Sequence, residues 1–168
     1  PIAETASIFA EMLMTEHLRK QEKDQIVKRE LLIRQLDDLY GSISRQAYFV
    51  LFEIQAHELL AKGASVDELC NAYLESLKEQ FGDAVAVPDE FKDEWMIIPH
   101  IFHTPFYCYG YSFGNLLTLG LYEQYRKEGQ AFVERYERFL SAGSTKPPAV
   151  LCKEIGIDQR QRTCTRTG

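Results

Sequence analysis

The stretch Pro99-His100-Ile101-Phe102-His103-Thr104-Pro105-Phe106-Tyr107-Cys108-Tyr109-Gly110-Tyr111 is the part of this sequence around which the rest is organised. Its thirteen residues include two histidines, three tyrosines and two prolines, which is too many polar aromatic side chains for an ordinary core helix. Each proline pushes the residue before it out of the helical region of φ/ψ space. The sequence therefore predicts a helix that begins at Pro105 or just after it.

Polar aromatic side chains share one face of that predicted helix. Tyr107 and Tyr111 are four residues apart and lie on the same face, while Tyr109 points elsewhere. His100 and His103 come just before the helix and are close enough in sequence to lie beside that face. Phenols and imidazoles are neutral hydrogen-bond donors, which suits holding a peptide carbonyl or stabilising an oxyanion. The alternative is an amphipathic core helix whose hydroxyls reach solvent.

The composition is that of a globular protein. The chain has 168 residues, of which 45% are hydrophobic and 26% are charged, so it can bury a core of its own. A net charge of -6 argues against a nucleic-acid partner, because phosphate binding needs a clustered basic surface. No apolar run approaches the ~20 residues of a membrane span and no signal peptide is visible, so we expect no membrane association.

The cysteines point to a reducing compartment. Cys70, Cys108, Cys152 and Cys164 form no Cys-x-x-Cys pair, which argues against a structural zinc knuckle and a thioredoxin-like motif. We expect most of them to be buried thiols in a cytoplasmic protein. The chain starts at Pro1, without Met and inside a predicted helix, so we also expect the native protein to extend further upstream.

Apolar residues follow the helical period, and no segment shows a convincing alternation typical of strands, so the predicted fold class is all-α. Residues 1–20 form an amphipathic helix in which Glu4 and Glu11 stand two turns apart on one side, beside small alanines. Residues 24–62 form a long periodic segment in which Gly41-Ser42 either kinks one helix or joins two. The apolar stripe stays in phase across the glycine, which favours one long helix.

Capping residues and glycines predict the other helix ends. Ser65-Val66-Asp67-Glu68 is a capping box for a helix that ends near Phe81-Gly82. Glu53 and His57 lie among bulky aromatic residues of the long helix, and the pattern assigns them no role. The remaining predicted helices run from Pro105 to about Lys127, from after Gly129 to Ala142-Gly143-Ser144, and from Pro147-Pro148 to near Gly156.

Ala3-Glu4-Thr5-Ala6-Ser7-Ile8-Phe9-Ala10-Glu11 and the segment Pro99–Gly114 are separated motifs that together resemble one family, the oligoendopeptidase F and thimet oligopeptidase family of zinc metallopeptidases. The first is similar to the family's second zinc motif, and the second resembles its substrate-clamping segment. Ala142–Asp158 resembles its closing helix. The resemblance covers residues 1–158 and implies the C-terminal helical part of a larger catalytic domain. Residues 159–168 do not resemble the family's usual ending and form an atypical tail, for which disorder is one alternative.

The resemblance implies a divided zinc site. Glu4 would be the third protein ligand of one catalytic zinc ion, and Glu11 would orient a ligating histidine. The family's His-Glu-x-x-His helix, which supplies two ligands and the general base, is absent from these residues and would lie upstream of Pro1. The implied partners are short peptide substrates and that upstream part of the same enzyme. One carboxylate cannot hold a catalytic zinc, so we predict that this chain alone binds no zinc and is inactive.

The resemblance also implies roles for the aromatic segment. Tyr111 matches the family tyrosine that donates to the scissile carbonyl or its oxyanion. Either His100 or His103 matches a histidine that contacts the substrate backbone. Tyr107 is the expected accessory donor, and Tyr109 is a second expected substrate contact.

The alternative to a peptidase is a non-catalytic helical module. Such a module would bind a partner chain through the surface that includes Ala3, Ala6 and Ala10, and that surface should be sticky.

Overall fold

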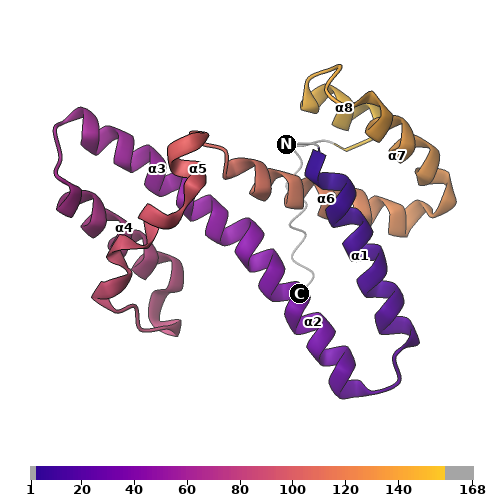
Figure 1. The fold of residues 1–168 in the computed structure, drawn as a ribbon. Helices are drawn as coiled ribbons and strands as arrows, with labels where there is room; N and C mark the ends of the chain where they lie inside the picture. Colours follow the sequence, from indigo (N-terminus) through magenta and orange to yellow (C-terminus); the bar gives the residue numbers. More distant parts are fainter. Residues whose placement is uncertain (1–2, 158–168) are drawn as a thin grey trace. The chain divides into compact units, whose positions relative to one another are not determined.

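The computed structural model describes residues 3–157, and the regular elements in that range are all helical. The predicted all-α class is therefore confirmed. In chain order the elements are α1 (Ala3–Gln21), α2 (Gln25–Leu39), the π-helix η1 (Tyr40–Arg45), α3 (Gln46–Ala61), α4 (Val66–Phe81), the 3-10 helices η2 (Gly82–Ala84) and η3 (Asp89–Ile97), α5 (Pro99–His103), α6 (Tyr109–Glu128), α7 (Gln130–Ala142) and α8 (Pro148–Glu154) (Figure 1). No helix in the described range is both long enough and apolar enough to cross a membrane.

The chain divides into two compact units, each with its own core. The first unit joins Pro1–Gln35 to Phe113–Gly168, and the second is Leu36–Ser112. Each unit is described by itself below. Cys164 and the predicted tail 159–168 lie outside the described residues.

The helix ends carry the signals that the sequence predicts. The Ser65 hydroxyl accepts the backbone N–H of Glu68, and the Glu68 carboxylate accepts the backbone N–H of Ser65 at 2.7 Å, which completes the capping box of α4. α4 then ends at Gly82, where φ is 53°, in the left-handed region that glycine adopts without strain. α7 ends in the same way at Gly143.

The backbone stays helical from α2 through η1 into α3. The residues that flank η1, Leu39 and Gln46, both have right-handed helical dihedral angles. The prediction of one long helix is thus confirmed, and Gly41-Ser42 lies within a π-helical turn rather than at a break. The Ser112 hydroxyl donates to the carbonyl of Ile43 at 2.8 Å, which satisfies a backbone acceptor inside that turn.

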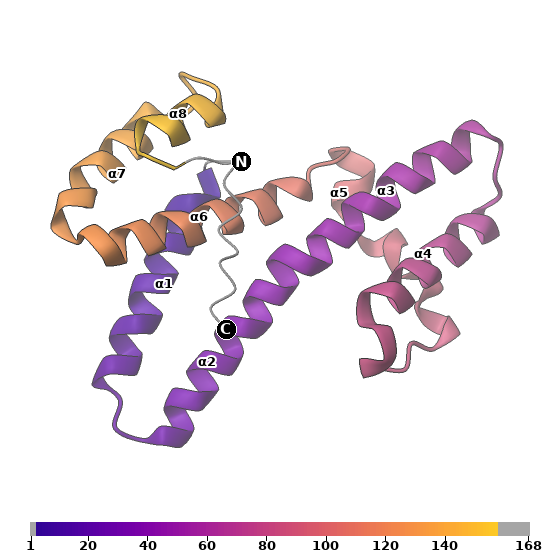
Figure 2. The ribbon, with the colours of Figure 1, turned by 180° about the vertical axis from the view of Figure 1, so that it is seen from behind.

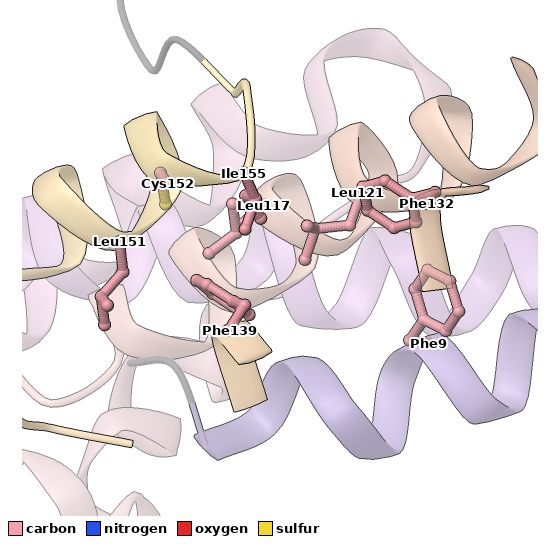
Figure 3. Packing of buried hydrophobic residues seen from close by; sticks show 8 residues of the cluster. All are labelled: Phe9, Leu117, Leu121, Phe132, Phe139, Leu151, Cys152 and Ile155. Atoms are coloured by element: carbon pink, nitrogen blue, oxygen red, sulfur yellow. The ribbon is translucent and has the colours of Figure 1, made fainter. Parts of the chain in front are cut away.

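The core of the first unit lies between α1, α6, α7 and α8 (Figure 3). Thr5 and Phe9 of α1 are buried, and the Phe9 ring stacks on Tyr136 of α7 with 4.4 Å between centroids. Because these two residues face the core, Ala6 and Ala10 on the other sides of α1 are exposed. The buried apolar cluster consists of Phe9, Leu117, Leu121, Phe132, Phe139, Leu151, Cys152 and Ile155.

The core of the second unit forms where α3 and α4 lie side by side, as both views show (Figures 1 and 2). The buried Tyr73 of α4 donates to the Glu94 carboxylate at 2.8 Å, and Arg45 forms an ion pair with the same carboxylate. These contacts hold η3 against the helix pair. The buried cluster consists of Phe49, Phe52, Ala56, Leu69, Tyr73, Leu77, Ile98 and Cys108. Cys70, Cys108 and Cys152 are buried, as the sequence predicts.

Candidate active site

The aromatic segment is built differently from the predicted helix. α5 begins with Pro99 at its first turn and ends at His103, and α6 begins only at Tyr109. The prediction of a helix start at Pro105 is therefore wrong. Thr104, which precedes a proline, has φ -147° and ψ 81°, and Phe106 has φ 59°, so neither residue is compatible with a right-handed helix.

A short turned segment, residues 104–108, connects the two helices. The backbone N–H of Tyr107 donates to the carbonyl of Thr104 at 3.1 Å, and the N–H of Gly110 donates to the carbonyl of Tyr107 at 2.9 Å. Tyr107 thus lies in this connection rather than on the face of α6, and its position depends on the turn.

Three of the predicted site residues nevertheless meet in the second unit, and we call His100, Tyr107 and Tyr111 the ring cluster. The Tyr111 hydroxyl and Nε2 of His100 are 3.1 Å apart and share a hydrogen bond. The Tyr107 ring lies parallel to the His100 imidazole, with 5.4 Å between centroids and 9° between planes. Tyr107 also meets the Tyr111 ring edge-on at 5.3 Å. The predicted proximity of these side chains is present, although the helix that was expected to produce it starts later.

The ring cluster is open to solvent on one side. Tyr107 is 40% exposed, whereas His100 and Tyr111 are half-buried. Tyr109 is 51% exposed on the first turn of α6 and is not one of the cluster's rings. His103 is exposed at the end of α5. The cluster thus offers phenol and imidazole hydrogen-bonding groups at an accessible surface, which is the chemistry needed to hold a carbonyl oxygen.

Glu53 of α3 is a neighbour of this segment for which the sequence predicts no role. Its side chain is 1% exposed, and its Oε1 accepts the backbone N–H of Phe106 at 2.8 Å. Burial, and then the Glu53 carboxylate, raise the pKa of the Cys108 thiol above its usual range. A carboxylate inside an otherwise apolar, aromatic helix face is the one signal in the sequence that could have drawn attention to it.

The predicted metal residues belong to the first unit. Glu4 is half-buried in the first turn of α1, and Glu11 is exposed two turns later. Within residues 3–157, no three His, Cys, Asp or Glu side chains are grouped so that they could hold a metal ion. The described residues therefore do not form a complete zinc site by themselves.

Known proteins share both the sequence and the fold. The chain matches the model of Peptidase family M3 over residues 1–165. It is 33% identical over 159 residues to the oligopeptidase PepF of Bacillus subtilis, a match that covers 94% of this chain and 24% of that protein. It is also 33% identical over 158 residues to an oligoendopeptidase F homolog of Borreliella burgdorferi, covering 93% and 27% of the two chains.

A solved structure agrees with this match. The crystal structure of oligoendopeptidase-F from Enterococcus faecium is similar with a TM-score of 0.84 and 31% identity, over 95% of this chain and 31% of that chain. The fold described here is therefore that of a helical peptidase. The chain belongs to peptidase family M3. It spans about a quarter of the length of the two curated relatives named above.

Proposed function

We propose that this chain is the C-terminal helical part of the catalytic domain of a zinc-dependent oligoendopeptidase that hydrolyses peptide bonds in short peptides. Membership of peptidase family M3 and the relatives' names as oligopeptidases support the peptidase reaction. By the complete enzyme we mean this chain joined to the rest of the protein that its longer relatives carry, which this proposal places upstream. The 168 residues alone should not hydrolyse peptides.

The observation that carries the proposal is the hydrogen bond between Tyr111 and His100, with Tyr107 packed against both rings. We assign to the Tyr111 hydroxyl the donation of a hydrogen bond to the scissile carbonyl oxygen, which gains negative charge as the bond breaks. Removing one such donor typically lowers kcat by a factor of about 10²–10³. His100 orients that hydroxyl and contacts the substrate backbone, and its position in the cluster favours it over His103. Tyr107 and Tyr109 are proposed as further substrate contacts.

The zinc part of the proposal needs residues outside this chain. Glu4 would contribute one carboxylate ligand, and Glu11 would orient a ligand that comes from elsewhere. The remaining ligands and the group that activates water would come from the upstream part of the complete enzyme.

A groove in the first unit supports a contact with that upstream part. It has a volume of about 330 Å³ and lies between α1 and α7. Its lining is almost entirely apolar and includes the exposed Ala6 and Ala10, whose small side chains allow another backbone to come close. The same groove would also serve the alternative function, in which the chain binds a separate partner and has no catalytic role. The groove by itself does not separate the two functions.

One experiment separates the two functions. The 168-residue chain, the complete enzyme and its Tyr111→Phe variant are compared for cleavage of an internally quenched peptide and for zinc content. We expect cleavage and bound zinc only in the complete enzyme, and a loss of about 10²–10³ in turnover in Tyr111→Phe with zinc retained. Unchanged turnover in Tyr111→Phe would refute the role of Tyr111. An inactive, zinc-free complete enzyme would leave the binding module as the function.

A further inference from the structure

The carboxylate of Glu53 needs an explanation, because burying an ionisable group is costly unless it is bonded. It sits in α3 among Phe49, Phe52 and Ala56, all members of the second unit's apolar core. The hydrogen bond from the backbone N–H of Phe106 reaches it across 53 residues of sequence. The contact therefore ties α3 to the middle of the connection between α5 and α6.

The residue that Glu53 binds has an unusual backbone. Phe106 has φ 59°, the one positive φ at a non-glycine residue among those described. A bulky residue pays a conformational cost in this left-handed region and keeps it only where surrounding contacts hold it there. Glu53 supplies one such contact, and His57, one turn further along α3, supplies a second by stacking on the Phe106 ring at 5.2 Å.

The residues on either side of Tyr107 are thus both attached to the core of the second unit. The Phe106 backbone is bonded to Glu53, and the Cys108 side chain is fully buried in the apolar cluster. Tyr107, between these two attachments, is 40% exposed and packs on His100 and Tyr111. Its place in the ring cluster follows from how its two neighbours are held.

We propose that Glu53 is a positioning residue of the active site: by binding the N–H of Phe106 it fixes the turn 104–108 and so places Tyr107 against His100 and Tyr111. The inference rests on the proposed peptidase function for its catalytic consequence, whereas its structural part concerns this chain alone. Glu53 touches neither substrate nor the reacting atoms in this proposal. It acts through the backbone of the turn.

Two substitutions separate the reach of Glu53 from its charge. Glu53→Gln keeps the length and an acceptor oxygen, and Glu53→Asp keeps the charge but is shorter by one methylene group. In the complete enzyme we expect Glu53→Gln to stay within about threefold of the parent kcat/KM. Glu53→Asp should lose about 10- to 100-fold, because small misplacements of binding groups have effects of this size. Full activity in Glu53→Asp would overturn the proposal.

A destabilised control tests for a merely structural effect. Leu69→Ala removes buried apolar contacts in the same core from α4, a helix that does not adjoin the turn in sequence. It should lower the melting temperature at least as much as Glu53→Asp does while leaving kcat/KM within about threefold. If the activities of all variants simply follow their melting temperatures, Glu53 has no positioning role.

A readout without catalysis keeps the two proposals distinguishable. Hydrogen exchange of the Phe106 amide and the nuclear Overhauser effect between the Tyr107 and His100 rings are measured in the 168-residue chain. Glu53→Asp should speed the exchange at least tenfold and weaken the ring contact, whereas Glu53→Gln should change neither. If these changes occur in a protein whose complete form cleaves no peptide, the proposed function fails and the positioning role stands. Unchanged exchange and ring contact in Glu53→Asp would overturn the positioning role whatever the activity.

Discussion

The hydroxyl of Tyr111 and Nε2 of His100 are 3.1 Å apart, although the two residues belong to different helices, α6 and α5. A phenol held by an imidazole has a restricted direction for its proton. In the tautomer in which Nε2–H of His100 donates to the Tyr111 oxygen, the phenol can donate its own proton to a carbonyl oxygen at the ring cluster, which is how preorganised donors stabilise a transition state.

The two residues should act as one unit in catalysis. In the complete enzyme, Tyr111→Phe should lower kcat/KM by about 10²–10³, and His100→Gln should lower it by at least tenfold. The double variant should lose clearly less than the product of the two losses, because each single change already removes their shared interaction. Steady-state kinetics on the four forms measures this coupling, with Tyr40→Phe, a phenol hydrogen-bonded to Gln80 instead, as the control. Strictly multiplicative losses would mean that the pair does not cooperate.

Glu4 should matter for the metal and not for the fold. In the complete enzyme, Glu4→Gln should remove most of the bound zinc after dialysis, and Glu11→Gln should weaken zinc affinity about 10- to 100-fold. Elemental analysis measures the zinc that Glu4→Gln retains, and competition with a chelator measures the zinc affinity of Glu11→Gln. Glu30→Gln, which changes an exposed carboxylate of α2, is the matched control. Retention of full zinc in Glu4→Gln would remove Glu4 from the ligand set.

Two tyrosines with buried hydroxyls, Tyr136 and Tyr73, should respond oppositely to loss of that hydroxyl. Tyr136 has a buried hydroxyl for which residues 3–157 provide no hydrogen-bond partner, whereas Tyr73 donates to Glu94 at 2.8 Å. Tyr136→Phe should therefore leave the free energy of unfolding of the 168-residue chain equal or raise it by up to about 1 kcal/mol. Tyr73→Phe should lower it by about 1–3 kcal/mol, because a half-buried carboxylate loses a donor. Urea unfolding at pH 7 measures both, and a larger loss for Tyr136→Phe would contradict this account.

The same tyrosines predict a fall in stability at alkaline pH. Burial raises the pKa of Tyr136 to about 12, and burial together with the Glu94 carboxylate raises the pKa of Tyr73. A tyrosine whose pKa is higher in the folded state contributes stability that is complete below its unfolded pKa, about 10, and is lost as the pH rises from there toward the folded value. The loss of stability between pH 9 and about pH 11.5 should thus be smaller in Tyr136→Phe than in the parent chain. An identical slope would show that Tyr136 is ionised as easily in the fold as outside it.

The capping box of α4 should contribute a measurable share of stability. Ser65→Ala should lower the free energy of unfolding by about 1 kcal/mol, and Ser65→Asp, which can accept the same N–H, should retain most of it. The bonds from the Ser65 backbone and hydroxyl lower the pKa of Glu68 below its ordinary value of 4.5. The stability that the ionised Glu68 carboxylate contributes is present above its pKa in the unfolded chain and is lost as the pH falls through its pKa in the folded chain. The difference between parent and Ser65→Ala should therefore narrow below about pH 4.

Local sequence signals identified most of the helix ends. The capping box at Ser65 and the positive-φ glycines Gly82 and Gly143 lie where the pattern predicts, because these effects act within a few residues. The predicted start of α6 is wrong, although a proline at position 105 is compatible with a helix start. Thr104 is extended and Phe106 is left-handed, so the helix begins only at Tyr109. Nothing local requires Phe106 to take that conformation.

The all-α class and the long helix through Gly41 follow from the period of the apolar residues, and family membership follows from motifs that are local in sequence. The helical class and the long helix depend on neighbours within one or two turns, and the family motifs are short stretches of sequence. The sequence alone therefore determined all three. The choice of His100 as the partner of Tyr111, and the contact of Glu53 with Phe106, were decided only by tertiary structure. A hydrogen bond between residues 53 apart depends on how helices pack, and that packing is set by the whole buried core rather than by any one segment.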